Sequence, residues 1–390
     1  MKILHIIPSI SSLRGGPSQA VLEMVKALQE CGVNAEILTT NDDGNNLLDI
    51  PLCKRVIYHD VPVWFFPRFS PSYYPLREFA FSWEFTQWLW CNIQYYELLH
   101  VHAIFSYPST IAMAIARHQN VPYINRPLGQ LCEWSLQQGK LKKNIYLKLI
   151  EKVNLVSAKT LHLTAKREQR ELNLLNWNLS SFVLPHGLNM PIKLANAREK
   201  LHQMLSIPLK TPIILFLSRL HTKKGLDYLI PALSKLHHQN FVFVLAGSGD
   251  PNYELEIERL LKVNNLDDRT YKLGFVSGEK KTLCLQGADL YALTSHSENF
   301  GISVLESLAS RTPTLVTTGV ALSDLVKEQN FGWVVDLEIE EITASIQEFL
   351  DNPAMAKEKG DRAAHYVAEN YAWEKIALNL KSIYENILRL

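Results

Sequence analysis

Two glutamates, Glu298 and Glu306, flank an Asn-Phe-Gly turn, and an apolar helical run begins at Ile302. The N-terminus of a helix offers free backbone N–H groups and the positive end of the helix dipole, which makes it an anion site. Carboxylates beside that site would repel a phosphate, but they can accept hydrogen bonds from hydroxyl groups. A ligand with hydroxyls on both sides of its phosphate groups is typically a nucleotide sugar, which has ribose on one side and a hexose on the other. The stretch therefore predicts a nucleotide-sugar site.

A basic loop, residues 218–225, lies between a predicted strand and a predicted helix and carries Arg219, Lys223 and Lys224. Arginine offers a planar fork of donors and lysine a compact charge, and both suit a diphosphate. A solvated basic loop is the alternative for any short charge run. The position at the carboxyl end of a strand favours function, and Lys224, next to Gly225, is a better candidate than Lys223.

Gly15 and Gly16 open a helix after the first predicted strand, and Pro17 suits the first helical position. The glycines would let a ligand approach the backbone, although two-glycine patterns also occur in ordinary loops. His100 and His102 end another strand and point to the same side of it. A neutral imidazole there could bind a sugar hydroxyl, but a histidine at a strand end is more often structural.

Two further glycine-containing loops are weaker signals. The run Gly247-Ser248-Gly249 lacks the spacing and the following helix of a dinucleotide fingerprint. No such fingerprint follows the first strand either, which disfavours an oxidoreductase. The loop with Phe275 and Val276 could hold a base against its backbone, or it is an ordinary turn.

The chain alternates short β-rich runs with longer helical patterns, which predicts parallel sheets of βαβ units. At 390 residues it is long enough for two doubly wound α/β domains, and the segment 185–197, with Pro, Gly and Asn, is the expected linker. Two such domains place a ligand cleft between them, at the carboxyl ends of the strands. The expected strands are 2–7, 35–39, 97–102, 122–125, 160–163, 182–184, 212–217, 241–246, 270–273, 290–293, 314–316 and 333–335.

The composition excludes several classes of protein. Forty basic against thirty-nine acidic residues give no support to nucleic-acid binding. No apolar run reaches the ~20 residues of a membrane-spanning helix, and the apolar start is too short for a signal peptide. The five cysteines are scattered and without CxxC spacing, so we expect reduced thiols in a cytoplasmic protein and no zinc site.

Residues 64–96 are unusually aromatic, and residues 140–152 mix lysines with leucine and isoleucine. Aromatic rings stack on sugars and favour membrane interfaces, while a core helix and its loop would account for most of them. The basic stretch is either an amphipathic face for an anionic membrane surface or a solvated helix face. Peripheral contact with the inner face of the plasma membrane would suit a lipid-linked sugar acceptor.

In order and spacing, these motifs together resemble glycosyltransferase family 4, retaining enzymes of the GT-B fold. The resemblance covers nearly the whole chain. Its motifs are Gly15-Gly16, His100-Val101-His102, Pro185-His186-Gly187, Ser218-Arg219, Lys224-Gly225, Ala246-Gly247-Ser248-Gly249, Gly274-Phe275-Val276 and the Glu298/Glu306 pair. It implies two facing Rossmann-like domains with an inter-domain cleft. Residues 1–190 would bind the acceptor and residues 191–372 the donor, with a C-terminal helix, 373–390, packing back on the first domain.

The resemblance also implies a role for each charged residue. Arg219 and Lys224 would hold the donor diphosphate and stabilise the leaving nucleoside diphosphate. Glu306 would accept hydrogen bonds from the ribose, and Glu298 would lie by the hydroxyls of the donor sugar. His102 matches the histidine that contacts the transferred sugar. Other donor-binding positions would be Gly15, Gly16, Gly247, Phe275, Val276, Asn299, Phe300, Gly301 and Ile302.

No DxD-type metal motif stands out where such an enzyme would need one, so we expect no metal and no cofactor, with the basic pair neutralising the leaving group. Members of this family retain the anomeric configuration without an obvious protein nucleophile, so the resemblance implies a front-face attack in which the donor phosphate helps to deprotonate the acceptor. One loop departs from the family: residues 125–129 place Arg126 before Pro127, and Leu128 stands where an arginine is usual. Arg126 and Gly129 are therefore acceptor-side candidates, and the acceptor stays open. Pro185-His186-Gly187 has His where Asn is common.

The sequence thus predicts a retaining hexosyltransferase that uses a nucleotide sugar, UDP-glucose first and GDP-mannose as an alternative. The acceptor would be a saccharide or a lipid-linked saccharide for cell-surface polysaccharide. Two rivals belong to other classes: a nucleotide-sugar epimerase of the same fold, and a non-catalytic sugar-binding protein. Intact Glu298, Arg219 and Lys224 speak against the binding protein.

Overall fold

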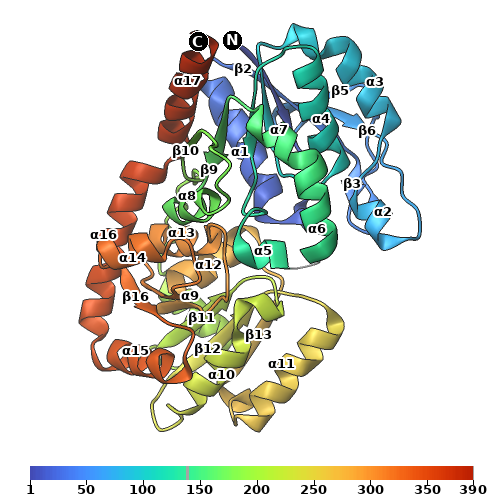
Figure 1. The fold of residues 1–390 in the computed structure, drawn as a ribbon. Coiled ribbons are helices and arrows are strands. Elements are labelled where there is room, and N and C mark those ends of the chain that lie inside the picture. Colours follow the sequence, from blue (N-terminus) through green and yellow to red (C-terminus); the bar gives the residue numbers. More distant parts are fainter. Residues whose placement is uncertain (138–139, 390) are drawn as a thin grey trace. The chain divides into compact units, whose positions relative to one another are not determined.

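The computed structural model describes residues 1–137 and 140–389, without the side chains of Lys140 and Lys142. The chain divides into two compact units (Figure 1). The first unit comprises Met1–Gly187 and Trp373–Leu390, and the second Leu188–Ala372. Each unit is built around one large, mainly parallel sheet, and the predicted α/β fold class is confirmed.

The sheet of the first unit has the strand order β10-β9-β8-β7-β1-β2-β6-β5. Apart from the antiparallel edge pair β5 and β6, its strands run parallel. Strands β3 and β4 form a separate two-stranded sheet. The strands are β1 (Lys2–Ile6), β2 (Asn34–Thr40), β3 (Asp42–Asp43), β4 (Asn46–Leu47), β5 (Arg55–Tyr58), β6 (Val61–Phe66), β7 (Leu98–His102), β8 (Tyr123–Arg126), β9 (Thr160–Leu163) and β10 (Ser181–Val183).

The helices of the first unit cover both faces of its sheet (Figure 1). Leu4 and Leu99 belong to a buried apolar cluster that α3 and α4 complete on one face, while Tyr384 of α17 contacts His100 on the other face. Helix α17 packs beside α1. The helices are α1 (Gly16–Glu30), α2 (Tyr74–Glu78), α3 (Trp83–Asn92), α4 (Tyr107–His118), α5 (Glu133–Gln137), α6 (Lys140–Tyr146), a π-helical turn (Leu147–Glu151), α7 (Lys152–Val156), α8 (Lys166–Asn173) and α17 (Trp373–Arg389).

The second unit has a six-stranded parallel sheet in the order β13-β12-β11-β14-β15-β16. Its consecutive strands therefore run 3-2-1-4-5-6, the dinucleotide-fold order. The strands are β11 (Ile213–Leu217), β12 (Val242–Ala246), β13 (Thr270–Gly274), β14 (Leu290–Leu293), β15 (Thr314–Thr317) and β16 (Gly332–Val335). The helices are α9 (Ala197–Leu205), α10 (Leu226–Ser234), α11 (Pro251–Val263), α12 (Gly278–Gly287), α13 (Ile302–Ala309), α14 (Ser323–Glu328), α15 (Ile339–Asp351) and α16 (Pro353–Tyr371).

The aromatic stretch corrects one expectation. Its first residues end strand β6, which we did not expect, and the rest lie on α2, α3 and their loops rather than on one core helix. Only four of its aromatic side chains are buried, Phe65, Phe66, Phe85 and Tyr96, whereas Trp83 and Tyr95 are more than half exposed. A core helix therefore does not account for most of them. Among the helices that the structure describes, none is long and apolar enough to cross a bilayer.

Candidate functional site

The charged motifs of the second unit meet at the switch point of its sheet, where the strand order reverses between β11 and β14. The loop after β11 carries Arg219 and Lys224, and the loop after β14 carries Glu298. The two loops are joined by hydrogen bonds, because His296 N donates to Lys223 O at 2.9 Å and Thr294 Oγ1 donates to Gly225 O at 2.8 Å. Residues 69 and 73 positions apart thus share one edge of the sheet.

Glycines are required here because the backbones approach closely. A Cβ on Gly225 would lie 1.9 Å from Thr294 O, and Gly225 has a φ of +67°, which favours glycine. A Cβ on Gly247 would lie 1.9 Å from Ser218 O, and one on Gly249 2.1 Å from Leu220 O. The Gly-Ser-Gly motif therefore packs against the basic loop. This close packing explains why glycines are needed there, so no bound dinucleotide is required to explain them.

Lys224 and Glu298 form an ion pair, and both side chains are largely buried. Glu298 is held by its backbone, since its N–H donates to Gly319 O at 2.9 Å and its carbonyl accepts from Ala321 N at 3.0 Å. An ammonium group has three protons, so Lys224 can keep its ion pair with Glu298 and still donate a hydrogen bond to a phosphate. The pair places a cation for a diphosphate beside a carboxylate for hydroxyls.

Glu306 lies on α13 and pairs with a residue that the sequence did not single out. Its carboxylate accepts from Lys281 Nζ of α12 at 2.5 Å. The first turn of α13 is fixed by the buried Tyr291, whose hydroxyl lies 2.7 Å from Ser303 Oγ and 3.1 Å from Leu217 O. Gly301, with a φ of +92°, is the N-cap residue of this helix and has no side chain with which to cap it.

The remaining donor-side candidates differ in exposure. Arg219 is exposed, whereas Phe300 is buried beneath the turn before α13. After β13, Phe275 is 75% exposed and Val276 is buried. Gly247 N donates to the carbonyl of Gly274 at 2.8 Å, so this loop borders the Gly-Ser-Gly turn. Within the second unit, the candidates from four different loops therefore lie along one edge of the sheet.

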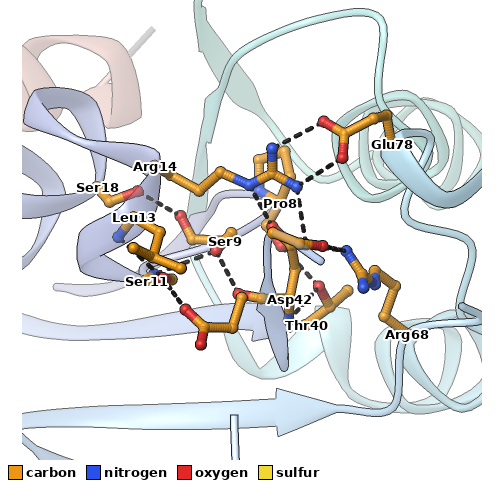
Figure 2. A network of polar contacts seen from close by, with 12 residues as sticks. Pro8, Ser9, Ser11, Leu13, Arg14, Ser18, Thr40, Asp42, Arg68 and Glu78 are labelled. Atoms are coloured by element: carbon orange, nitrogen blue, oxygen red, sulfur yellow. Dashed lines mark hydrogen bonds and ion pairs between the residues drawn. The ribbon is translucent and has the colours of Figure 1, made fainter. Parts of the chain in front are cut away.

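In the first unit, Gly15 and Gly16 open α1 as expected, and a polar network missed from the sequence holds their loop (Figure 2). Arg14 donates to both Asp42 oxygens, at 2.6 and 2.8 Å, and to both Glu78 oxygens, at 2.7 and 3.1 Å. Arg68 completes the network by pairing with Asp42. The partners are distant in sequence, so spacing gives no signal for them. Because Gly15 has a φ of +80° and a Cβ there would touch nothing, its glycine serves conformation rather than packing.

His102 is the last residue of β7 and is fully buried, and its Nε2 lies 3.1 Å from His5 Nδ1. Arg126 is the last residue of β8 and is fully buried. The prediction that it lies in a loop is therefore wrong. It donates to the His186 imidazole, 2.8 Å from Nδ1, and burial lowers its pKa to about 10. Gly129, at φ +73°, donates to buried Glu168 at 2.7 Å. Arg126 and Gly129 thus have protein partners rather than open surroundings.

Comparison with known families decides what these two units are. Residues 15–178 match the family described as glycosyl transferase 4-like domain, and residues 197–373 match the family described as glycosyl transferases group 1. The chain is a group 1, family 4-like glycosyltransferase. The predicted family is therefore confirmed, and the two family matches correspond to the two units, apart from residue 373, which begins the last helix of the first unit.

The glycosyltransferase has curated relatives of partial and of full length. It is 32% identical over 175 residues to an uncharacterized glycosyltransferase of Methanocaldococcus jannaschii, which covers 44% of each chain. It is 26% identical to a D-inositol 3-phosphate glycosyltransferase of Xylanimonas cellulosilytica over 95% of this chain and 91% of that one. The chain thus spans less than half the length of the first of these relatives.

Solved structures show the GT-B fold over the whole glycosyltransferase. A sucrose-phosphate synthase of Thermosynechococcus elongatus has a TM-score of 0.80 at 20% identity and covers 100% of both chains. HepE of Anabaena, solved with UDP-glucose, has a TM-score of 0.76 at 18% identity and covers 99% of this chain and 100% of that one. At such identities the likeness concerns the fold alone.

Proposed function

We propose that this glycosyltransferase is a retaining, metal-independent hexosyltransferase that moves glucose from UDP-glucose to a saccharide or lipid-linked saccharide in cell-surface polysaccharide assembly. The observation that carries the proposal is the contact between Lys224 and Glu298 at the switch point of the second sheet. It joins a group suited to a diphosphate with a group suited to sugar hydroxyls. The UDP-glucose complex of HepE supports the choice of donor.

The chemistry follows from where charge develops. Breaking the bond between sugar and diphosphate builds negative charge on the phosphate and oxocarbenium character on the sugar. Arg219, Lys224 and the N-terminal turn of α13 would stabilise the first charge, and preorganised groups of this kind lower a barrier most effectively. In this proposal the two basic side chains do what a metal ion does elsewhere. Attack from the front face, with the donor phosphate taking the acceptor proton, would retain the configuration.

We propose further that the acceptor side meets an anionic membrane surface. Leu141, Ile145, Leu149 and Val153 recur every four residues from α6 to α7, and all are exposed, Leu141 by 76%. The π-helical turn between these helices has a wider spacing than an α-helix and helps to keep such residues on one face. Lys148 lies on this stretch; Lys140 and Lys142 belong to the same expected basic face, and their side chains lie outside the described residues.

Calorimetric titration with UDP, GDP and ADP in the presence of EDTA tests the donor site. We expect binding of UDP in preference to GDP and ADP, unaffected by EDTA. Preference for GDP would replace the UDP-glucose assignment with a GDP-mannose one. No binding by any of the three would refute the diphosphate site at Arg219 and Lys224. Incubation with UDP-glucose alone, followed by isomer analysis, would reveal an epimerase.

Sedimentation with lipid vesicles tests the membrane surface. We expect the protein to bind vesicles of anionic phosphatidylglycerol and not vesicles of phosphatidylcholine. Leu149→Glu should abolish this binding, because it places a charge in the apolar stripe. Leu255→Glu changes an exposed leucine of the second unit and serves as the matched control. Equal binding by both variants would refute this surface.

A further inference from the structure

Four histidines from three strands lie on one face of the first sheet. His5 on β1 stands beside His100 on β7, and His102 follows two residues later on the same face. His162 of β9 lies on the same face, with its Nδ1 3.3 Å from His100 Nε2. All four are fully buried, and Tyr384 of the last helix, α17, covers them and is buried as well.

These side chains form one continuous chain of hydrogen bonds. It begins at the carbonyl of Leu184, which lies 2.8 Å from His162 Nε2. His162 Nδ1 faces His100 Nε2, and His100 Nδ1 lies 2.6 Å from the Tyr384 hydroxyl. The hydroxyl lies 3.5 Å from His5 Nε2, and His5 Nδ1 lies 3.1 Å from His102 Nε2. His102 Nδ1 is buried and has no hydrogen-bond partner among the described residues.

The direction of this chain is determined by its first member. Each imidazole is neutral, because burial and the charge of nearby Arg126 lower the histidine pKa values well below their usual range. A neutral imidazole has one N–H and one lone pair, and a carbonyl can only accept. His162 must therefore donate from Nε2 to Leu184 and accept at Nδ1 from His100 Nε2–H.

The same argument continues to the other end. His100 Nδ1 then accepts a hydrogen bond from the Tyr384 hydroxyl, and this is the shorter of the two contacts that the hydroxyl makes with His100 and His5. The tyrosine oxygen accepts from His5 Nε2–H, and His5 Nδ1 accepts from His102 Nε2–H. All four histidines are thus Nε2–H tautomers, and His102 Nδ1 is left as a lone-pair acceptor at the end of the chain.

We infer that His5, His100, His162 and Tyr384 are positioning residues that lock His102 in the Nε2–H tautomer, so that its Nδ1 accepts a hydrogen bond from a substrate hydroxyl. A carbonyl or carboxylate could not fill that position, because it has no proton to donate. The part that concerns substrate rests on the proposed function, whereas the tautomers follow from the structure alone. The last helix contributes Tyr384, so its docking controls the state of a residue at the end of β7.

A metal site is the alternative for His5, His100 and His102, whose ring nitrogens lie within 4.8 Å of one another. The His102 ring stacks on both others, with 4.3 Å between the centroids of His100 and His102 and 17° between the planes of His5 and His102, whereas His5 and His100 are tilted by 43°. Imidazoles around a metal instead converge through their nitrogens, and the fully buried cation Arg126 on the neighbouring strand would repel the ion. The hydrogen-bonded chain fits these contacts better.

Nuclear magnetic resonance of the full chain with isotope-labelled histidine tests the inference directly, because a protonated ring nitrogen and an unprotonated one have widely separated shifts. In the wild type we expect Nε2 protonated and Nδ1 unprotonated in all four histidines. A protonated Nδ1 in His5 or His102 would contradict the inferred direction of the hydrogen bonds. So would a change of these signals to those of zinc-bound imidazoles on titration with zinc.

Tyr384→Phe removes both contacts of the hydroxyl, so His5 no longer has an acceptor for its Nε2–H. The His5–His102 pair can then reverse, and we expect His102 Nδ1 to become partly protonated. Tyr123→Phe removes a hydroxyl from another buried tyrosine of the same unit, one that donates to Asn154 O, and should leave the tautomers unchanged. An unaltered His102 tautomer in Tyr384→Phe would overturn the inference. If this variant does not fold, the wild-type tautomers still decide.

Kinetics separate this inference from the proposed function. With UDP-glucose as donor, we expect Tyr384→Phe to lower kcat for UDP release on the order of tenfold, since a wrong histidine tautomer impairs catalysis. The Kd for UDP should not change, because Tyr384 is not among the UDP-binding candidates. If the wild type has all four histidines as Nε2–H tautomers but releases no UDP, the proposed function is refuted, whereas the inferred series of hydrogen bonds is not. Correct tautomers with unchanged kcat in Tyr384→Phe would overturn the positioning role.

Discussion

Acidification is expected to unfold the first unit, because it buries five histidines as neutral groups. Burial is the main reason that the pKa of each lies below the usual 6.5, that of His5 at about 3. In the unfolded chain these groups take up protons near pH 6.5, whereas the folded unit excludes them. Stability therefore falls as the pH drops through 6.5 and continues to fall towards the folded pKa values. The five are His5, His100, His102, His162 and His186.

The size of the effect follows from linkage. At one pH unit below 6.5, each histidine that stays neutral in the folded state costs about 1.4 kcal/mol, and five cost about 7 kcal/mol. A domain is stable by only about 5–15 kcal/mol. Burial raises the pKa values of Glu151 and Glu168, which then bind protons more readily when folded and offset part of this loss. The remaining loss is still comparable with the whole stability of the unit.

Urea unfolding followed by tryptophan fluorescence, from about pH 7.5 to about pH 5.5, measures this loss. Of the eight tryptophans, only Trp333 lies in the second unit, so the signal reports mainly on the first. His186→Asn keeps an acceptor for Arg126 and removes one titrating group, so its loss at about pH 5.5 should be about 1.4 kcal/mol smaller. His59→Asn alters an exposed histidine with a φ of +49° and should behave like the wild type. A pH dependence of His186→Asn equal to that of the wild type would refute the reasoning.

Three substitutions test other parts of the structure. Glu306→Ala should raise the Kd for UDP about tenfold or more in calorimetry, through loss of charge-assisted hydrogen bonds to the ribose; an unchanged Kd would remove Glu306 from the nucleotide site. Lys224→Ala should lower kcat about a hundredfold through lost stabilisation of the leaving group, and wild-type turnover would contradict that role. Gly187→Ala should lower the free energy of unfolding by about 1–3 kcal/mol, because its Cβ would lie 2.3 Å from the Trp373 ring; urea unfolding at wild-type stability would show that the ring gives way.

The fold class could be predicted because βα alternation is a local signal. All twelve expected strands are present within two residues of their predicted ends. Strands β5 and β6 were missed. The last residues of β6 are also the first residues of the aromatic stretch, so the end of this strand could not be told apart from that stretch. The glycines of the second unit were also visible in the sequence. Their reason was not, because the atoms that exclude a side chain at Gly225 and Gly247 belong to Thr294 and Ser218.

The family, the two βα-rich halves and the chemical types of the candidate residues could all be inferred from the sequence, because motifs and hydrophobic periods lie in consecutive positions. The interaction partners of these residues could be identified only in the folded structure. Parallel strands bring together loops that are far apart in the chain, so Lys224 meets Glu298 and Arg14 meets Glu78. Likewise, His100 and Tyr384 are separated by 284 positions, and only the packing of α17 on the sheet joins them. A histidine's tautomer depends on such neighbours, which no local pattern contains.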